Sequence, residues 1–227
     1  MNEALTLVIA NKNYSSWSSR PWLAMTELGV PFKERMLKFD SEDWEKHIET
    51  LSPSRLVPVL WEGEPGTDFA TWDTLAIIER LHELFPQEGI WPTDAQARAR
   101  ARSLAADFHA GYRALRAAMP MNLRGSYPGK GMNPEVRQDI ERMIGHWTRT
   151  RREFGAGGEF LFGAYCAADA YFTPVASRFV TYGVALEGEA QVYQKTLLGT
   201  QSFGAWRKAA LDETEFVKMD EPYADAP

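Results

Sequence analysis

The sequence predicts an α/β domain followed by an all-helical domain. In the first 85 residues, short apolar segments rich in β-favouring residues alternate with helical patterns. A stretch that contains proline and glycine follows at 86–92, as in many linkers between domains. From residue 93 onward, apolar residues recur at helical spacing. We therefore expect one domain at 1–85, a linker at 86–92 and a helical domain at 93–227.

The composition is typical of a globular protein, with 44% hydrophobic and 25% charged residues. The net charge of −6 argues against a nucleic-acid binder and against binding to anionic membranes. No stretch approaches the ~20 apolar residues of a membrane span, and the N-terminus lacks the basic flank of a signal peptide. A single cysteine, Cys166, excludes an intrachain disulfide, and no Cys/His cluster has metal-ligand spacing. We expect a cytoplasmic protein without a metal.

The first element is a strand at 5–10 that leads through a polar turn into a helix ending near Gly29. The turn carries Ser15 and Ser16 where the helix begins. The first turn of a helix has unpaired N–H groups and the positive end of the dipole, so it favours anions and lowers the pKa of a thiol placed there. Serine is also an ordinary helix cap. Both interpretations stay open on this stretch alone.

The next elements are a strand within 32–39, a short charged helix within 41–51 and a strand at 57–61. A strand, a helix and a second strand in succession indicate parallel pairing. Proline at the entrance to the third strand predicts a cis peptide between Val57 and Pro58. In that conformation, we expect the Val57 N–H and C=O to be available to an extended ligand.

A fourth strand begins near Phe69 and should form a hairpin with the third. The following helix opens with Asp73 and Thr74, and Leu75, Ile78 and Leu81 form its apolar stripe. An acid and a hydroxyl at a helix start are ordinary capping chemistry. They are also suited to holding an ammonium group and a carboxylate together.

These residues together resemble the N-terminal domain of cytosolic glutathione S-transferases. That family has a thioredoxin-like β-α-β-α-β-β-α domain, with a catalytic residue after the first strand, a cis proline before the third, and an acid or Gln plus Ser at the third helix. The serine-rich run most resembles the zeta class, whose pattern is serine-serine-cysteine-x-x-Arg. Trp17 stands at the position of the zeta cysteine, and Asp73-Thr74 replaces Gln-Ser or Glu-Ser. We therefore expect a zeta-like, serine-type member.

The resemblance implies a role for each matching position. Ser15, by alignment with the zeta serine, or Ser16, by its distance from Arg20, should donate a hydrogen bond to the glutathione thiolate. Val57 should pair with the cysteinyl backbone, and Asp73-Thr74 should hold the γ-glutamyl end. Arg55 or Lys38 should meet the glycine carboxylate. The expected glutathione-binding residues are Val57, Pro58, Asp73, Thr74, Arg55 and Lys38.

The second half begins with a predicted long helix, capped by Thr93 or Asp94 and running through Met119. Its buried stripe should include Ala101, Leu104 and Phe108. Three arginines at positions 98, 100 and 102 suit a solvated face or the rim of a homodimer. A loop near 119–131 should border the substrate site, and a helix should run from Asn133-Pro134 to about Phe154.

A buried helix is predicted to begin near Cys166, with Asp169 completing its cap. We interpret Cys166 as a small buried residue and not as a nucleophile. Arg178 lies in this apolar helix and needs a partner, either a core carboxylate or the carboxylate of a substrate. Two short helices should close the domain within 188–211. The last residues, 220–227, should either cover the domain or stay loose.

The leading hypothesis is a glutathione transferase that stabilises the glutathione thiolate for attack on a small electrophile. The zeta likeness also implies an alternative, a glutathione-dependent cis–trans isomerase or dehalogenase of small carboxylic acids in which glutathione is recycled. A third hypothesis is a non-catalytic binding module. The candidate contacts to the second substrate are Trp17, Arg124 and Arg178.

Overall fold

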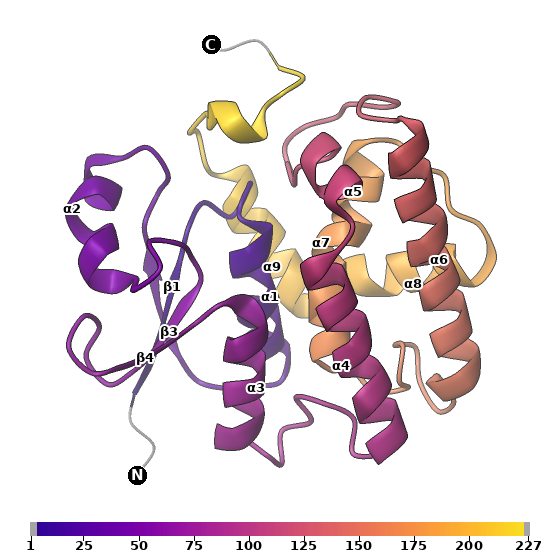
Figure 1. Cartoon of the computed structure of the whole chain (residues 1–227), viewed down its shortest axis with the longest axis horizontal. Coiled ribbons are helices and arrows are strands. Elements are labelled where there is room, and N and C mark those ends of the chain that lie inside the picture. Colours follow the sequence, from indigo (N-terminus) through magenta and orange to yellow (C-terminus); the bar gives the residue numbers. More distant parts are fainter. Residues whose placement is uncertain (1–3, 225–227) are drawn as a thin grey trace.

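The computed structural model describes residues 4–224. A four-stranded mixed sheet with three helices forms the first half, and a bundle of helices forms the second (Figure 1). The predicted combination of an α/β domain and an all-helical domain is confirmed. The ends of the two predicted domains at Met1 and Pro227 lie outside the described residues. No helix within residues 4–224 is long and apolar enough to cross a membrane.

The sheet has the strand order β2-β1-β3-β4. The strand bounds are Leu5–Ile9 for β1, Lys33–Met36 for β2, Val59–Glu62 for β3 and Phe69–Trp72 for β4. The pair β1–β2 is parallel, as the sequence predicted, whereas β3 is antiparallel to both β1 and β4. Every residue of β1 is buried, since this central strand is covered on both faces.

Three helices belong to the sheet domain: α1 at Ser16–Glu27, α2 at Glu42–Leu51 and α3 at Thr74–Leu84. Helix α1 contains Pro21, which has no N–H to donate to the carbonyl of Trp17 one turn earlier. That carbonyl instead accepts a hydrogen bond of 3.2 Å from the hydroxyl of Thr74. The carbonyl that Pro21 leaves without an intrahelical partner therefore connects the first turns of α1 and α3.

The second half contains α4 at Ala95–Ala110, α5 at Arg113–Ala118, α6 at Pro134–Phe154, α7 at Ala167–Thr181, α8 at Gly188–Leu198, α9 at Gln201–Leu211 and the short 3₁₀ helix η1 at Lys218–Asp220. The predicted single helix to Met119 is wrong. It breaks at Gly111 and Tyr112, and Tyr112 has φ of 55°, in the left-handed region. The predicted stripe of Ala101, Leu104 and Phe108 is nevertheless buried in α4, and Leu115 is buried in α5 after the break.

Helix α7 is the centre of the helical half. All of its residues except Val180 are buried, and it packs against α1 of the sheet domain. At its start, the carboxylate of Asp169 accepts a 2.9 Å hydrogen bond from the N–H of Cys166, as predicted. Because α1 and α7 are in contact, residues near the start of α1 face residues of the helical half.

The connection from α3 to α4, residues 85–94, contains neither helix nor strand. It includes the proposed linker at 86–92, although Ile90 and Trp91 within it are buried. We keep the two domains and this linker as a proposal.

Candidate active site

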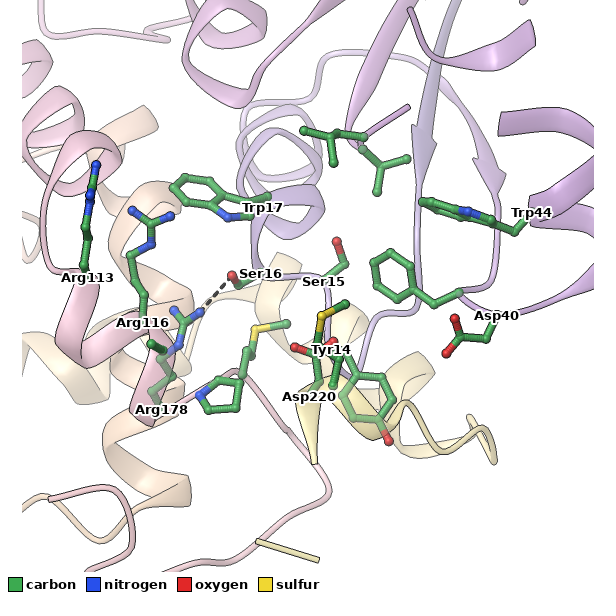
Figure 2. Close-up of a pocket in the computed structure, with 17 residues that line it drawn as sticks. Tyr14, Ser15, Ser16, Trp17, Asp40, Trp44, Arg113, Arg116, Arg178 and Asp220 are labelled. Carbon is green, nitrogen blue, oxygen red and sulfur yellow. Dashed lines mark hydrogen bonds between the residues drawn. The ribbon is translucent and has the colours of Figure 1, made fainter. Parts of the chain in front are cut away.

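A cavity of about 880 Å³ lies where the two halves meet, and we call it the interdomain cavity. Its volume is in the range of small-molecule sites. The sheet domain contributes the turn after β1, the loop before α2 and the residues before β3. The helical half contributes α5, α7 and the C-terminal segment. Its lining includes Tyr14, Ser15, Ser16, Trp17, Trp44, Val57, Arg113, Arg116, Arg178, Met219 and Asp220 (Figure 2).

Ser15 is the N-cap of α1. Its hydroxyl oxygen accepts a hydrogen bond of 3.4 Å from the N–H of Ser18. The same hydroxyl donates to the Ser18 hydroxyl over 2.7 Å. Ser15 lines the interdomain cavity, yet both of these bonds serve the helix start.

Ser16 is the first residue of α1, and its hydroxyl points toward Arg178 (Figure 2). The Nη2 of Arg178 donates to the Ser16 Oγ over 2.9 Å. The Ser16 carbonyl accepts from Nη1 of Arg20 over 2.5 Å. The N–H of Trp17, one residue later, has no hydrogen-bond partner within residues 4–224. The helix start therefore offers a hydroxyl and a free amide beside two guanidinium groups.

Arg20 and Arg178 are both buried, and neither has a carboxylate within 4 Å among the described residues. The alternative in which Arg178 pairs with a carboxylate of the core is therefore wrong. Instead, its Nε donates to the carbonyl of Met119 over 2.8 Å, and its buried Nη1 has no partner in the described chain. Burial lowers the pKa of Arg178 to about 10, and it lowers the pKa of Arg20 well below its usual value. A pKa of about 10 keeps Arg178 cationic at neutral pH.

Two further arginines reach the interdomain cavity from α5. Arg113 is exposed, and Arg116 is half-buried with its guanidinium against the Trp17 ring, 4.9 Å from the ring centroid. The Nη1 of Arg116 also donates to the carbonyls of His109 and Gly111, so the break between α4 and α5 fixes its direction. Only Asp40 and Asp220 among the lining residues are acidic.

Arg113, Arg116 and Asp220 line the cavity but were not predicted from the sequence. The two arginines are three residues apart and would share one face of a helix, which was the available signal. The prediction of one unbroken helix hid this signal, because the break at Gly111 and Tyr112 decides which face of α5 lies toward the cavity. No local pattern marked Asp220, since it lies in the C-terminal segment, which was expected either to cover the helical domain or to stay loose.

The C-terminal segment forms one wall of the interdomain cavity through Met219 and Asp220. The carboxylate of Glu221 accepts hydrogen bonds of 2.7 Å from the hydroxyls of Tyr14 and Tyr127. The interpretation that this segment covers the domain is confirmed as far as residue 224. Tyr14 also lines the cavity, but its hydroxyl is occupied by this contact, and burial raises its pKa.

The predicted glutathione-binding residues fall into two groups. Val57 lines the interdomain cavity, and the Val57–Pro58 peptide is cis, as predicted. Neither the N–H nor the C=O of Val57 has a backbone partner in the part of the chain that the structure describes. Asp73 and Thr74 are not among the cavity's lining residues. Asp73 caps α3 through the N–H of Leu75, and Thr74 bonds the carbonyl of Trp17. Their role remains a prediction.

The remaining basic candidates, Arg55, Lys38 and Arg124, do not line the interdomain cavity. Arg55 is exposed and pairs with Glu49 over 3.3 Å. Lys38 pairs with Glu215 of the C-terminal segment. Arg124 does not line the interdomain cavity, because its guanidinium donates to the carbonyls of Glu213 and Glu215. Arg124 therefore anchors the C-terminal segment. No group of three or more potential metal ligands occurs within residues 4–224.

Comparison with known proteins shows what this chain is similar to. Residues 14–84 match the family described as glutathione S-transferase, N-terminal domain. A maleylpyruvate isomerase from Ralstonia sp is 34% identical over 100 residues, which span 42% of this chain and 45% of that protein. The match thus covers less than half the length of that curated relative.

Solved structures with low identity share the whole fold. A glutathione transferase homologue from Burkholderia gl BGR1, solved with bound glutathione, is 20% identical with a TM-score of 0.69, covering 93% of this chain and 100% of that one. A maleylacetoacetate isomerase from Anaeromyxobacter dehalogenans 2CP-1, solved with GSH in its active site, is 24% identical with a TM-score of 0.64, covering 91% and 96%. The chain has the glutathione transferase fold, with a thioredoxin-like first domain.

Proposed function

We propose that this protein is a glutathione-dependent enzyme that acts on a small electrophile carrying a carboxylate. The observation that carries the proposal is the composition of the interdomain cavity. One side offers a serine hydroxyl at a helix start, and the other offers the guanidinium groups of Arg113, Arg116 and Arg178. Guanidinium groups bind carboxylates with charge-assisted hydrogen bonds. The zeta-like, serine-type assignment and the homodimer belong to this proposal.

The residues of the first domain fit glutathione. The unpaired N–H and C=O of Val57 suit the backbone of an extended peptide. The Ser16 hydroxyl and the free N–H of Trp17 lie at the start of α1, where the helix dipole favours an anion. Asp73-Thr74 at the start of α3 would hold the γ-glutamyl end, and Arg55 or Lys38 the glycine carboxylate, as the resemblance implies.

When bound, glutathione supplies a thiolate nucleophile. The chain's own residues then have separate tasks. The serine hydroxyl and the amide at the start of α1 keep the thiol ionised. Arg113 and Arg116 hold the carboxylate of the second substrate near the thiolate, and Arg178 adds positive charge to the same cavity. Met219 and the ring of Trp17 supply apolar surface in the cavity lining.

Isomerisation of a small unsaturated diacid is the second candidate, and one observation favours it. Three arginines against two acids in the cavity lining exceed what a neutral electrophile needs. The partial likeness to a maleylpyruvate isomerase points the same way. In a transferase glutathione is consumed, whereas in an isomerase it is returned unchanged.

The test is a comparison of two substrates with glutathione present. The protein is first titrated with glutathione by calorimetry, then assayed with a chlorinated nitroaromatic and with maleylpyruvate, while free thiol is measured. Turnover of maleylpyruvate with constant thiol identifies the isomerase, and loss of thiol with the aromatic identifies the transferase. Binding without turnover of either supports the non-catalytic module, and absence of glutathione binding overturns the proposal.

A further inference from the structure

We propose that Ser16, and not Ser15, donates the hydrogen bond to the glutathione thiolate, and that Arg178 polarises the Ser16 hydroxyl for this task. The inference rests on the proposed function, since it concerns the thiol of bound glutathione. It assigns Arg178 a role that precedes any contact with a second substrate. Arg178 acts here through Ser16 and is a positioning residue.

The hydroxyl proton of Ser15 is already used in a hydrogen bond within the protein. Its hydroxyl donates to the Ser18 Oγ over 2.7 Å, and its oxygen accepts from the N–H of Ser18. A hydroxyl has one proton to donate. To donate to a ligand, Ser15 would have to break its bond to Ser18 at the helix cap.

The hydroxyl proton of Ser16, in contrast, has no acceptor within residues 4–224. Its Oγ accepts from Nη2 of Arg178 over 2.9 Å, and it donates to no acceptor within the described residues 4–224. Because Arg178 has no acceptor atoms, the Ser16 proton cannot point at it and must turn elsewhere. Ser16 lines the interdomain cavity, so a thiolate there is the partner that the geometry leaves for this proton.

Arg178 is also a fixed cation without a salt bridge among the described residues, although Asp220 in the lining of the same cavity interacts with it electrostatically. It is buried, its Nε is held by the carbonyl of Met119 over 2.8 Å, and no carboxylate lies within 4 Å in the described chain. A hydroxyl that accepts from a cation is a stronger donor, because hydrogen bonds in a chain polarise one another. The buried Arg20 bonds the Ser16 carbonyl and adds positive charge at the same residue.

The consequence is a lower pKa of the bound thiol, which is measurable without a second substrate. Thiolate absorbance in the ultraviolet is titrated against pH for glutathione bound to the wild-type protein and to three variants. Ser16→Ala should raise the thiol pKa by about one to two units, the size of a hydrogen bond to a charged group. Arg178→Gln should raise it by about one unit. Ser15→Ala should leave it within about 0.3 units of the wild-type value, because that proton is used elsewhere.

A double-mutant cycle separates polarisation through Ser16 from the direct charge of Arg178. In the Ser16→Ala background, Arg178→Gln should change the thiol pKa by less than half of its effect in the wild type. An equal effect in both backgrounds would show that Arg178 acts on the thiolate directly, and would overturn the relay. A larger shift in Ser15→Ala than in Ser16→Ala would overturn the choice of serine.

Two controls keep the outcomes distinct. Calorimetry of the wild type shows first whether glutathione binds, so failure of the proposed function is seen before any variant is compared. If Arg178→Gln does not fold, Arg178→Lys retains a cation, and Ser16→Thr retains the hydroxyl. Both should keep the thiol pKa below that of Ser16→Ala, and a thiol pKa equal to that of Ser16→Ala in both would contradict the inference.

Discussion

The indole of Trp17 and the guanidinium of Arg116 are stacked in the wall of the interdomain cavity, with the guanidinium carbon 4.9 Å from the ring centroid. A second guanidinium, that of Arg20, lies 4.2 Å from the same ring. Trp17 occupies the position at which the zeta pattern has cysteine. At this position the chain therefore has an aromatic surface that orients cations in place of a thiol.

Trp17→Leu should weaken the binding of a carboxylate substrate by releasing Arg116. A cation–π contact contributes about 0.5–2 kcal/mol, so we expect KM for a carboxylate substrate to rise roughly two- to thirty-fold. Glutathione affinity should change less, because it does not depend on Arg116. Steady-state kinetics with each substrate varied in turn measures both. Trp17→Phe keeps an aromatic face, so its KM for the carboxylate substrate should lie between the values of the wild type and of Trp17→Leu. An unchanged KM in Trp17→Leu would contradict the role of the stack.

Ser15→Ala should lower stability without changing the thiol chemistry. Ser15 is the N-cap of α1, and loss of such a cap costs about 1 kcal/mol of unfolding free energy. The matched control is Ser41→Ala, which removes the equivalent cap of α2, where the hydroxyl accepts from the N–H of Trp44. Urea denaturation should show losses of similar size in both variants. A cap role would be refuted if Ser15→Ala unfolded at the wild-type midpoint.

Much of the first domain could be predicted because its signals are local. The strand before Ser15, the cis peptide at Val57–Pro58 and the caps at Asp73 and Cys166 each depend on a few neighbouring residues, and the structure has all of them. The serines at the start of the first helix line the cavity, and their contact with a thiolate stays a prediction.

The partners across the cavity could not be predicted in the same way. Arg113 and Arg116 face it only because Tyr112 adopts a left-handed conformation, which no strong local signal announces. The absence of a carboxylate beside Arg178 depends on residues brought together by the packing of α1 on α7. Distant contacts of this kind are set by the tertiary fold, and residue spacing does not encode them.

The affinity for an anionic substrate should fall as the pH rises through about 6. Asp220 lines the cavity, and burial raises its pKa to about 6, with Arg178 opposing the rise and Glu221 and Asp40 adding to it. Below this pH Asp220 is neutral, and above it a negative charge repels a carboxylate ligand. KM for a carboxylate substrate measured between pH 5 and about 8 should therefore increase with pH.

Asp220→Asn is the matched control for this pH dependence, because the amide keeps the shape and cannot ionise. Its KM should stay near the low-pH value of the wild type across the same range. The contribution of Asp220 to folding stability also falls as the pH rises. A raised carboxyl pKa means that the folded state binds the proton more tightly, so stability from this group is lost between its usual pKa and about 6. A wild-type KM that is flat with pH would exclude Asp220 from the substrate's surroundings.

Glu221→Ala should detach the C-terminal segment from the cavity. The Glu221 carboxylate is buried and accepts from the hydroxyls of Tyr14 and Tyr127. Its loss leaves Tyr127 without its acceptor and Tyr14 with only the carbonyl of Glu215. Such a loss costs about 1–3 kcal/mol of local stability. Hydrogen exchange of residues 213–224 should become faster, and KM for the second substrate should rise because Met219 and Asp220 leave the wall. Lys218→Ala, an exposed substitution in the same segment, should exchange like the wild type. If both variants exchanged at the same rate, Glu221 would not hold the segment, and the hydrogen bonds of Arg124 to the carbonyls of Glu213 and Glu215 would suffice.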